Sequence, residues 1–139
     1  MSHTVTTKSV VIKSAALLEK AVEALKAKGI NISLPNGTKV QPVNLFQAAE
    51  TGIAVNLDGW NYPVVVDTVN GKIHYDNYNG SWGKQEKIDE LLQEYVRQEA
   101  IDLYAAQGFE IDEFNTRYLE NGDLELHLKS SSWGQYGSN

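Results

Sequence analysis

The residues of this chain that could transfer a proton are grouped around His74. This histidine lies in the run KIHYD, two positions before Asp76, and an Asn-Gly pair separates the run from Asp67. Asn-Gly between two strand-like runs predicts a hairpin, which would place His74 near Asp67 or Asp76 as an acid–base pair. Because no nucleophile is placed beside them, this pattern supports only a secondary hypothesis of catalysis.

A further acid falls on the apolar stripe of a predicted long helix. Glu99 shares that stripe with Ile88, Leu92, Tyr95 and Leu103. A carboxylate at such a position is costly to bury unless it is paired or hydrogen-bonded, and buried acids of this kind can serve as general acids or bases. The alternative, which we favour, is that the charged second half of this helix extends past the sheet into water.

The stretch HYDNYNGSWGKQ, residues 74–85, gathers aromatic and amide side chains directly before this helix. The first turn of a helix has unpaired N–H groups and a partial positive charge. A carboxylate or phosphate could be held there, with flat rings stacking beside it. The residues that would form this binding surface are Asn77, Tyr78, Asn79, Ser81 and Trp82.

A structural interpretation of the same stretch is favoured, and the binding surface is its alternative. Tyr75 and Trp82 can fill the core while Asn77 and Asn79 satisfy a tight turn through side-chain-to-backbone hydrogen bonds. In that case the loop is a turn whose aromatic side chains are covered.

A second aromatic cluster lies in DGWNYP, residues 58–63. The following apolar run predicts a central buried strand, so Trp60 and Tyr62 could lie at the end of the sheet near Trp82. One aromatic patch would then be built from two distant parts of the sequence. Equally, Trp60 could simply cover the edge of the core.

No metal site and no cofactor site is predicted. The chain has no cysteine, and His3, His74 and His127 do not have the spacing of metal ligands. The glycine patterns of nucleotide-binding loops and the serine nucleophile elbow are absent. The case for an enzyme is therefore thin.

The charge of the chain argues against nucleic acid as its partner. Eighteen acidic and twelve basic residues give a net charge of −6, and the only arginines are Arg97 and Arg117. Binding to nucleic acid depends largely on Lys and Arg contacts to phosphate. No apolar run approaches the roughly 20 residues that span a bilayer, and no secretory signal is found. We expect a soluble protein of the cytoplasm, or of the plastid stroma if the chain is plastid-encoded.

Hydrophobic periodicity and turn residues predict the elements that position these side chains. In the first half they are a strand over 5–12, a helix capped by Ser14 and ended by Gly29, and a hairpin of 30–34 and 38–43 around the turn 35–37. The middle of the chain is predicted to form a helix or loop over 45–52 and strands over 53–57, 62–67 and 72–76. After it we expect a helix over 84–107, a strand over 109–119 and, following an Asn-Gly turn, a last strand over 123–129.

These elements predict a single two-layer α+β domain over residues 1–129. It has an antiparallel or mixed sheet of about five to seven strands with two helices on one face. Residues 130–139 form a Gly- and Ser-rich tail that we expect to be flexible. The order helix, glycine, strand, Asn-Gly turn and strand occurs twice, which indicates a possible internal duplication. The alternative is that a glycine after the helix and an Asn-Gly turn in the hairpin are common wherever a helix is followed by a hairpin.

Several motifs resemble those of one known family. They are the initial MSH, the run YPVVVDTVNGKIHYDNYNGSWG, the Gly-Phe step after the long helix and the hairpin ENGDLELHL. The chain resembles the domain of unknown function 1257 family, which includes the hypothetical chloroplast reading frame 35 of algal plastids and cyanobacterial relatives. It departs from that family at Thr4, where members have an aromatic residue, and in its last ten residues. The resemblance implies a small intracellular α+β domain without an established activity, and it supplies no catalytic residues.

The sequence thus favours non-catalytic binding through an aromatic and asparagine-rich surface around Trp60, Tyr62, Tyr78 and Trp82. A protein partner is favoured over a small polar-aromatic ligand such as a nucleotide or sugar derivative, because sheet edges offer a docking strand. The third hypothesis is an enzyme that uses His74 and a neighbouring aspartate.

Overall fold

The computed structural model of the chain describes residues 4–6, 11–45, 48–76, 81–111, 117–118, 124–125 and 128–130. The chain divides into two compact units, Met1–Tyr95 and Val96–Asn139. The boundary falls within the second helix.

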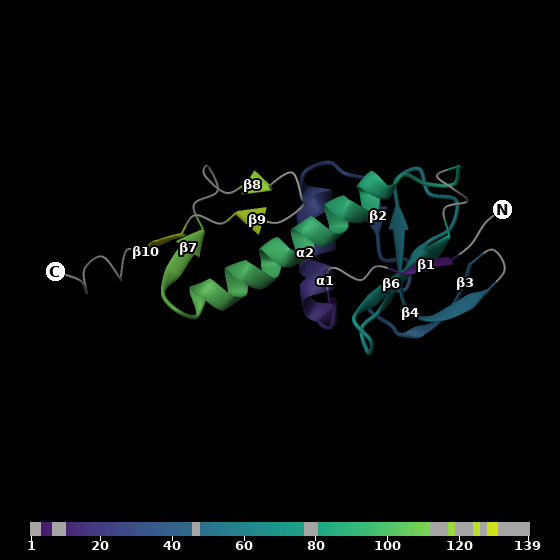
Figure 1. Ribbon diagram of the computed structural model, residues 1–139, viewed down its shortest axis with the longest axis horizontal. Coiled ribbons are helices and arrows are strands. Elements are labelled where there is room, and N and C mark those ends of the chain that lie inside the picture. The colour runs from purple at the N-terminus through teal and green to yellow at the C-terminus, as the bar shows by residue number, and fades with distance from the viewer. Residues whose placement is uncertain are drawn as a thin grey trace. The chain divides into compact units, whose positions relative to one another are not determined.

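The elements follow one another along the chain as Figure 1 shows. The helices are α1 (Ala15–Ala27) and α2 (Gln85–Ala105). The strands are β1 (Thr4–Thr6), β2 (Ile32–Ser33), β3 (Gln41–Asn44), β4 (Ala49–Leu57), β5 (Val64–Asp67), β6 (Lys72–Asp76), β7 (Phe109–Ile111), β8 (Arg117–Tyr118), β9 (Leu124–Glu125) and β10 (Leu128–Ser130).

The first unit contains a six-stranded sheet in which every described pairing is antiparallel. Its strand order is β1-β6-β5-β4-β2, and β3 also pairs with β4. Together with the two helices, this sheet confirms the predicted α+β fold class. It also confirms that the apolar run VVV forms a central strand, since β5 is paired on both sides.

The helices cover one face of this sheet, here called the helix-covered face. Successive residues of a strand point to opposite faces, and alternate residues of β4, β5 and β6 share one buried cluster with apolar residues of both helices. The strand residues of that cluster are Ile53, Val55, Leu57, Val64, Val66, Ile73 and Tyr75. The helix residues include Leu18, Val22, Leu25, Ile88, Leu91 and Tyr95.

Helix α1 begins and ends where the sequence predicts. The Ser14 side chain accepts a hydrogen bond from the Leu17 N–H at 3.1 Å, which satisfies one of the unpaired amides of the first turn. Gly29 follows the last turn at φ +85°, a left-handed conformation that costs glycine little. Local chemistry therefore sets both ends of α1.

The predicted hairpin around residues 35–37 is wrong. Both β2 and β3 pair with β4, through Ile32 opposite Leu57 and Gln41 opposite Gly52. The turn after β2 therefore does not join two strands that pair with each other. Residues 49–52, for which the sequence allows a helix or a loop, form the first half of β4.

Strand β4 changes partners at Gly52. Residues 49–52 pair with β3, and residues 53–55 pair with β5. A Cβ atom on Gly52 would lie 2.5 Å from the Val66 carbonyl oxygen, so only glycine fits at this position without a shift of the backbone. The β3–β4 hairpin, which is formed by the residues up to Gly52, packs on the face of the sheet opposite the helices. This face is here called the second face. Val43 and Leu45 of the hairpin form a small buried cluster there with Ala54 and Val65.

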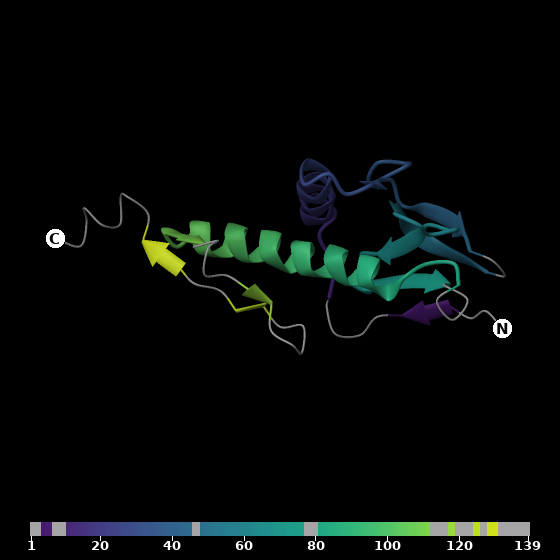
Figure 2. The same ribbon diagram turned by 90° about the horizontal axis from the view of Figure 1, so that it is seen from above.

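Helix α2 holds both ends of α1 through two adjacent residues. At the N-terminal end, the Ser14 N–H donates to the Tyr95 hydroxyl over 3.1 Å. At the C-terminal end, Lys28 Nζ lies 3.1 Å from Glu94 Oε1. Since neighbouring residues reach opposite ends of α1, the two helices must cross steeply, as Figures 1 and 2 show.

The pairing of Lys28 with Glu94 gives a first prediction. The Glu94 side chain is 3% exposed, whereas Glu23, which pairs with Lys26, is 64% exposed. We expect Lys28→Met to lower the free energy of unfolding by about 1 kcal/mol more than Lys26→Met, because only the former removes a cation from a buried carboxylate. Urea denaturation of the two variants measures this difference, and equal effects would show that other groups satisfy Glu94.

The second unit contains the rest of α2 and two short antiparallel pairs. β7 pairs with β10, and β8 pairs with β9. The β8–β9 pairing agrees with the predicted hairpin, although its Asn-Gly turn at residues 121–122 lies outside the described residues. The same is true of residues 131–139 of the predicted tail. The single domain over 1–129 and the internal duplication stay predictions.

Candidate functional site

The aromatic side chains singled out in the sequence come from two loops that are bonded to each other. One loop connects β4 to β5, and the other precedes α2. The Asn61 N–H donates to the Trp82 carbonyl oxygen at 2.8 Å. The Trp60 indole Nε1–H donates to the Lys84 carbonyl oxygen at 3.2 Å. The structure therefore brings together Trp60, Tyr62 and Trp82, named here the aromatic surface.

Trp60 anchors this surface to the core. Its ring lies edge-on to Tyr75, with centroids 5.6 Å apart and an interplanar angle of 82°, a favourable arrangement for two aromatic rings. The ring also lies directly against Gly83, where a Cβ atom would overlap it. Tyr75 is 4% exposed and belongs to the core. Trp60 therefore covers the edge of the core, as one of the two interpretations of the sequence expects.

Tyr62 and Trp82 form the outer part of the aromatic surface. Their ring centroids are 5.4 Å apart and their planes are tilted by 54°. Both side chains are half-buried, and Ser81 beside them is exposed. The structural interpretation of the loop requires Tyr75 and Trp82 to fill the core. Tyr75 does so, whereas Trp82 is only half-buried. The predicted site residues Asn77, Tyr78 and Asn79 lie outside the described residues.

The N-terminal end of α2 carries two acidic side chains, Glu86 and Asp89. Glu86 lies in the first turn, and Asp89 accepts a hydrogen bond from Gln85 Nε2 at 3.2 Å. Gln85 Oε1 in turn accepts one from the Tyr75 hydroxyl at 2.9 Å. Burial, together with the charge of Asp89, raises the pKa of Tyr75 against the opposing effect of the Gln85 bond. A carboxylate or phosphate at this helix end would meet these acids, so the structure favours the rings over the helix end as a binding surface.

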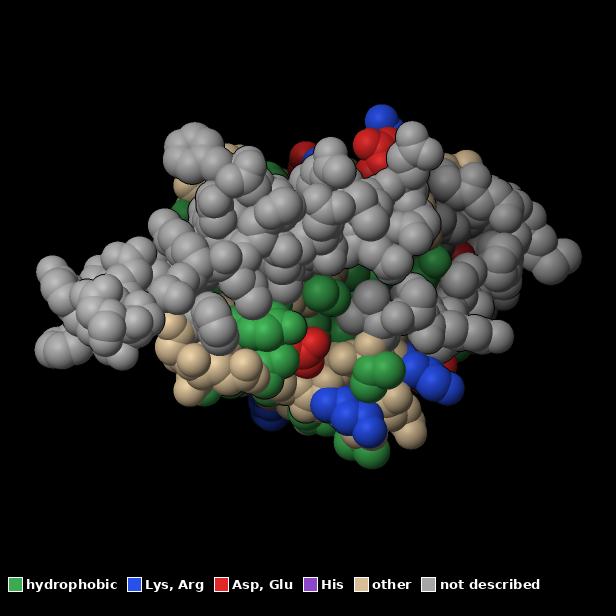
Figure 3. Space-filling model, turned by 60° about the vertical axis from the view of Figure 1, so that its left-hand side comes forward, with side chains coloured by type: hydrophobic (Ala, Val, Ile, Leu, Met, Phe, Trp, Pro, Cys, Tyr) green, Lys and Arg blue, Asp and Glu red, His purple; other side chains and the backbone are tan. Residues whose placement is uncertain are grey.

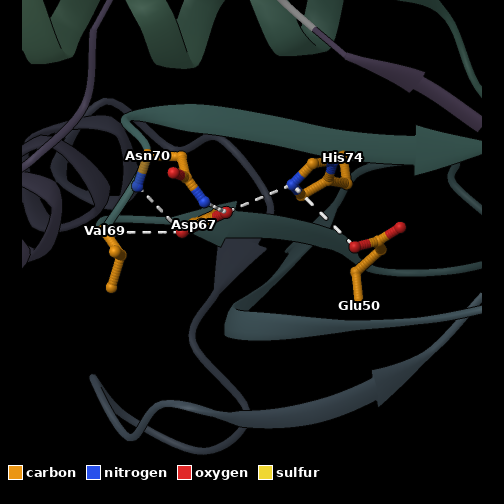
Figure 4. Close-up of polar contacts among 5 residues, drawn as sticks. All are labelled: Glu50, Asp67, Val69, Asn70 and His74. Carbon is orange, nitrogen blue, oxygen red and sulfur yellow. Dashed lines mark hydrogen bonds and ion pairs between the residues drawn. The ribbon is translucent and has the colours of Figure 1, made fainter.

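The predicted partners His74 and Asp67 are close together on the second face, as Figure 4 shows. His74 Nε2 lies 3.4 Å from Asp67 Oδ2 and 4.0 Å from Glu50 Oε2. Glu50 comes from β4 and His74 from β6, with β5 between them in the sheet order. Glu50 was not singled out in the sequence, because only the folding of the β3–β4 hairpin over this face brings it near.

The Asp67 carboxylate also holds the β5–β6 turn. Its Oδ1 accepts the backbone N–H groups of Val69 and Asn70, each at 3.1 Å, and its Oδ2 accepts the Asn70 side-chain amide at 2.8 Å (Figure 4). Asp-anchored turns of this kind are common at hairpin ends. The turn thus accounts for Asp67 as a structural residue, and its role in an acid–base pair with His74 stays a prediction.

These bonds make a pH prediction. The Asn70 side chain and, less strongly, the Asn70 N–H, His74 and Val69 lower the pKa of Asp67, while burial opposes them. A carboxyl with a folded-state pKa below its unfolded value of about 3.9 stabilises the fold above that value. This stabilisation is lost as the pH falls through the folded-state pKa.

We therefore expect the stability difference between the wild type and Asp67→Asn to shrink as the pH is lowered from about 5 toward 2. Urea denaturation at each pH measures it. The variant removes the titrating carboxyl while keeping an oxygen acceptor in the turn, so the change of the stability difference with pH reports on the titration of Asp67 alone. A difference that stays constant over this range would show that Asp67 does not have the lowered pKa.

The other predicted acids are Asp76 and Glu99, and they differ in burial. Asp76 ends β6 and is 3% exposed, and Glu99 is exposed, as the favoured interpretation of α2 expects. The buried acid of this helix is instead Glu94. Its position three residues after Leu91, at the edge of the apolar stripe, was the signal that could have found it.

Charged side chains and potential metal ligands could mark a further site. On the face drawn in Figure 3, the coloured Lys and Arg side chains lie in separate places among acidic and hydrophobic ones. In the described part of the chain, no three His, Asp or Glu side chains are grouped so that they could hold a metal ion. Neither described helix has the length and apolar character needed to cross a membrane.

Comparison with known proteins found no matching family model, no matching curated protein and no matching solved structure. The resemblance to the domain of unknown function 1257 family therefore stays an expectation from the sequence motifs.

Proposed function

We propose that this chain is a non-catalytic binding domain of the cytoplasm or plastid stroma that takes a protein partner through the aromatic surface. The observation that supports the proposal is the Tyr62–Trp82 pair, in which two large rings in contact remain half-buried. Partly exposed Tyr and Trp side chains are the residues most enriched where proteins bind one another.

The arrangement of the rings suits binding because little has to be ordered when a partner arrives. The backbone bond from Asn61 to Trp82 ties the two loops together, and Trp60 is fixed by its bond to the Lys84 carbonyl and by its contact with Tyr75. A surface that is already ordered loses less conformational entropy on association.

Two single variants test the proposal. We expect Tyr62→Ala and Trp82→Ala each to weaken a partner's Kd by at least about tenfold, or about 1.4 kcal/mol. The matched control is Tyr104→Ala, which removes a half-buried tyrosine from α2 outside the aromatic surface. Proteins retained by the tagged wild type and by the control are purified, and their Kd values for the wild type and for each variant are measured.

The far-UV circular dichroism and the melting temperature of each variant show whether it folds. If every retained protein binds the wild type and both test variants with equal Kd, the aromatic surface is not the binding site and the proposal fails.

Asn61 favours a second candidate, the capture of a small polar-aromatic ligand. Asn61 is exposed, its backbone N–H is bonded to the Trp82 carbonyl, and it directly precedes Tyr62, so the loop that carries these rings also carries an exposed amide. Rings and amides together suit the flat faces and polar edges of a nucleotide or sugar derivative. A ligand that raises the melting temperature of the wild type but not of Trp82→Ala supports this candidate. A saturating set of such ligands without any shift contradicts it.

A further inference from the structure

The chain contains four Asn-Gly pairs, and two of them lie in described turns: Asn36-Gly37 and Asn70-Gly71. This dipeptide is chemically reactive because glycine has no side chain to hinder its backbone nitrogen. The Gly nitrogen loses its proton and attacks the Asn side-chain carbon Cγ. The new N–Cγ bond replaces the Cγ–Nδ2 bond, and ammonia leaves.

The resulting five-membered succinimide then takes up one water molecule from the solvent. Water opens it at Cγ to give aspartate, or at the backbone carbonyl to give isoaspartate. No oxidant or reductant is involved. Two pairs with the same intrinsic chemistry can react at very different rates when the fold restrains one of them.

The pair at residues 70–71 is restrained at every group that would have to move. The Asn70 amide donates to Asp67 Oδ2 at 2.8 Å, and the attacking Gly71 N–H donates to the Asp67 carbonyl at 2.7 Å. Gly71 is buried, and its carbonyl accepts the Ile12 N–H at 3.0 Å. The Val11 side chain closes the remaining space, at 2.5 Å from where a Cβ atom on Gly71 would lie.

The pair at residues 36–37 is held by longer hydrogen bonds, one of them from the Lys39 N–H to the Asn36 carbonyl at 3.2 Å. Gly37 has φ +60° with open space around it, and its N–H donates to Leu34 over a longer distance of 3.1 Å. The turn is also exposed over residues 35–37. Both asparagines are exposed, so exposure does not distinguish the two sites. The expected difference in reaction rate comes from the hydrogen bonds that hold each Asn-Gly pair.

We propose that Asn36 is a site of spontaneous deamidation and isoaspartate formation in the folded protein, and that the Asp67-anchored turn protects Asn70. In the folded chain we expect Asn36 to react at least about tenfold faster than Asn70, the ratio that about 1.4 kcal/mol of additional opening free energy produces.

The test incubates the purified full-length protein at mildly alkaline pH and follows both sites by peptide mass spectrometry. Isoaspartate is counted separately by enzymatic methylation. The same incubation in urea provides the reference in which both pairs are released from the fold, and there we expect the two rates to converge. Asp67→Ala, which frees the Asn70 amide, is expected to speed the reaction at Asn70 and leave Asn36 unchanged.

Two results would overturn the proposal. One is a folded protein in which Asn70 reacts as fast as Asn36. The other is a folded protein in which Asn36 stays intact while the unfolded chain reacts at both sites. If Asp67→Ala does not fold, the comparison of the folded and urea-unfolded wild type still decides between these outcomes.

Discussion

Replacing Gly83 with alanine is expected to lower the free energy of unfolding by about 3 kcal/mol. The added Cβ atom would overlap the Trp60 ring, and an indole ring packed against Tyr75 cannot yield as a flexible chain end would. Trp60 would have to leave both Tyr75 and the Lys84 carbonyl. The same variant should therefore disturb the aromatic surface, seen as a change in tryptophan fluorescence.

A double-mutant cycle checks the cause of this effect. If the overlap with Trp60 is responsible, alanine at residue 83 should cost much less when Trp60 has been replaced by leucine, so the two effects should not be additive. Ser81→Ala is the matched control, because Ser81 is an exposed neighbour in the same loop. Strict additivity would point to a cause other than the contact between Gly83 and Trp60.

Replacing Gly52 with alanine is the second change expected to have a large effect, also about 3 kcal/mol. The Cβ atom would lie 2.5 Å from the Val66 carbonyl oxygen and 2.8 Å from Val65 Cγ1. Since the nearest atom belongs to the backbone of β5, the only relief is a shift of strand against strand at the point where β4 changes partners. We expect a loss of stability in urea denaturation and weaker protection of the β3–β4 hairpin in hydrogen exchange.

This variant should differ from Gly83→Ala in one informative way. Trimming Val65 to alanine removes the side-chain overlap but not the carbonyl oxygen, so Val65→Ala should not rescue Gly52→Ala. Thr51→Ala, at the exposed neighbouring position, is the control. A rescue by Val65→Ala would mean that the side chain, and not the backbone, restricts this position to glycine.

Local features of the sequence were sufficient for α1 and for the central strands. Ser14 and Gly29 mark the two ends of the helix through bonds and dihedral angles within a few residues. The run of three valines in β5 is buried on both faces of the sheet, as an unbroken apolar run predicts. These signals act over short distances along the chain.

Pairing between distant segments could not be predicted in the same way. Pro35–Gly37 has the composition of a hairpin turn, yet β2 and β3 both pair with β4. Turn residues specify the local bend of the backbone, whereas the partner of a strand depends on which edge is available and which face is apolar. The burial of Glu94 likewise depends on Lys28, 66 positions away.

The candidate site shows the same division. The sequence alone determined that aromatic and amide residues gather before α2 and again before β5, and that Asp67 and His74 flank a turn. Only the tertiary structure decided that Tyr62 contacts Trp82, that Trp60 faces Gly83, and that Glu50 approaches His74. The physical reason is that residue types and turns are local properties, whereas these contacts arise when strands distant in the chain align and bury their apolar faces.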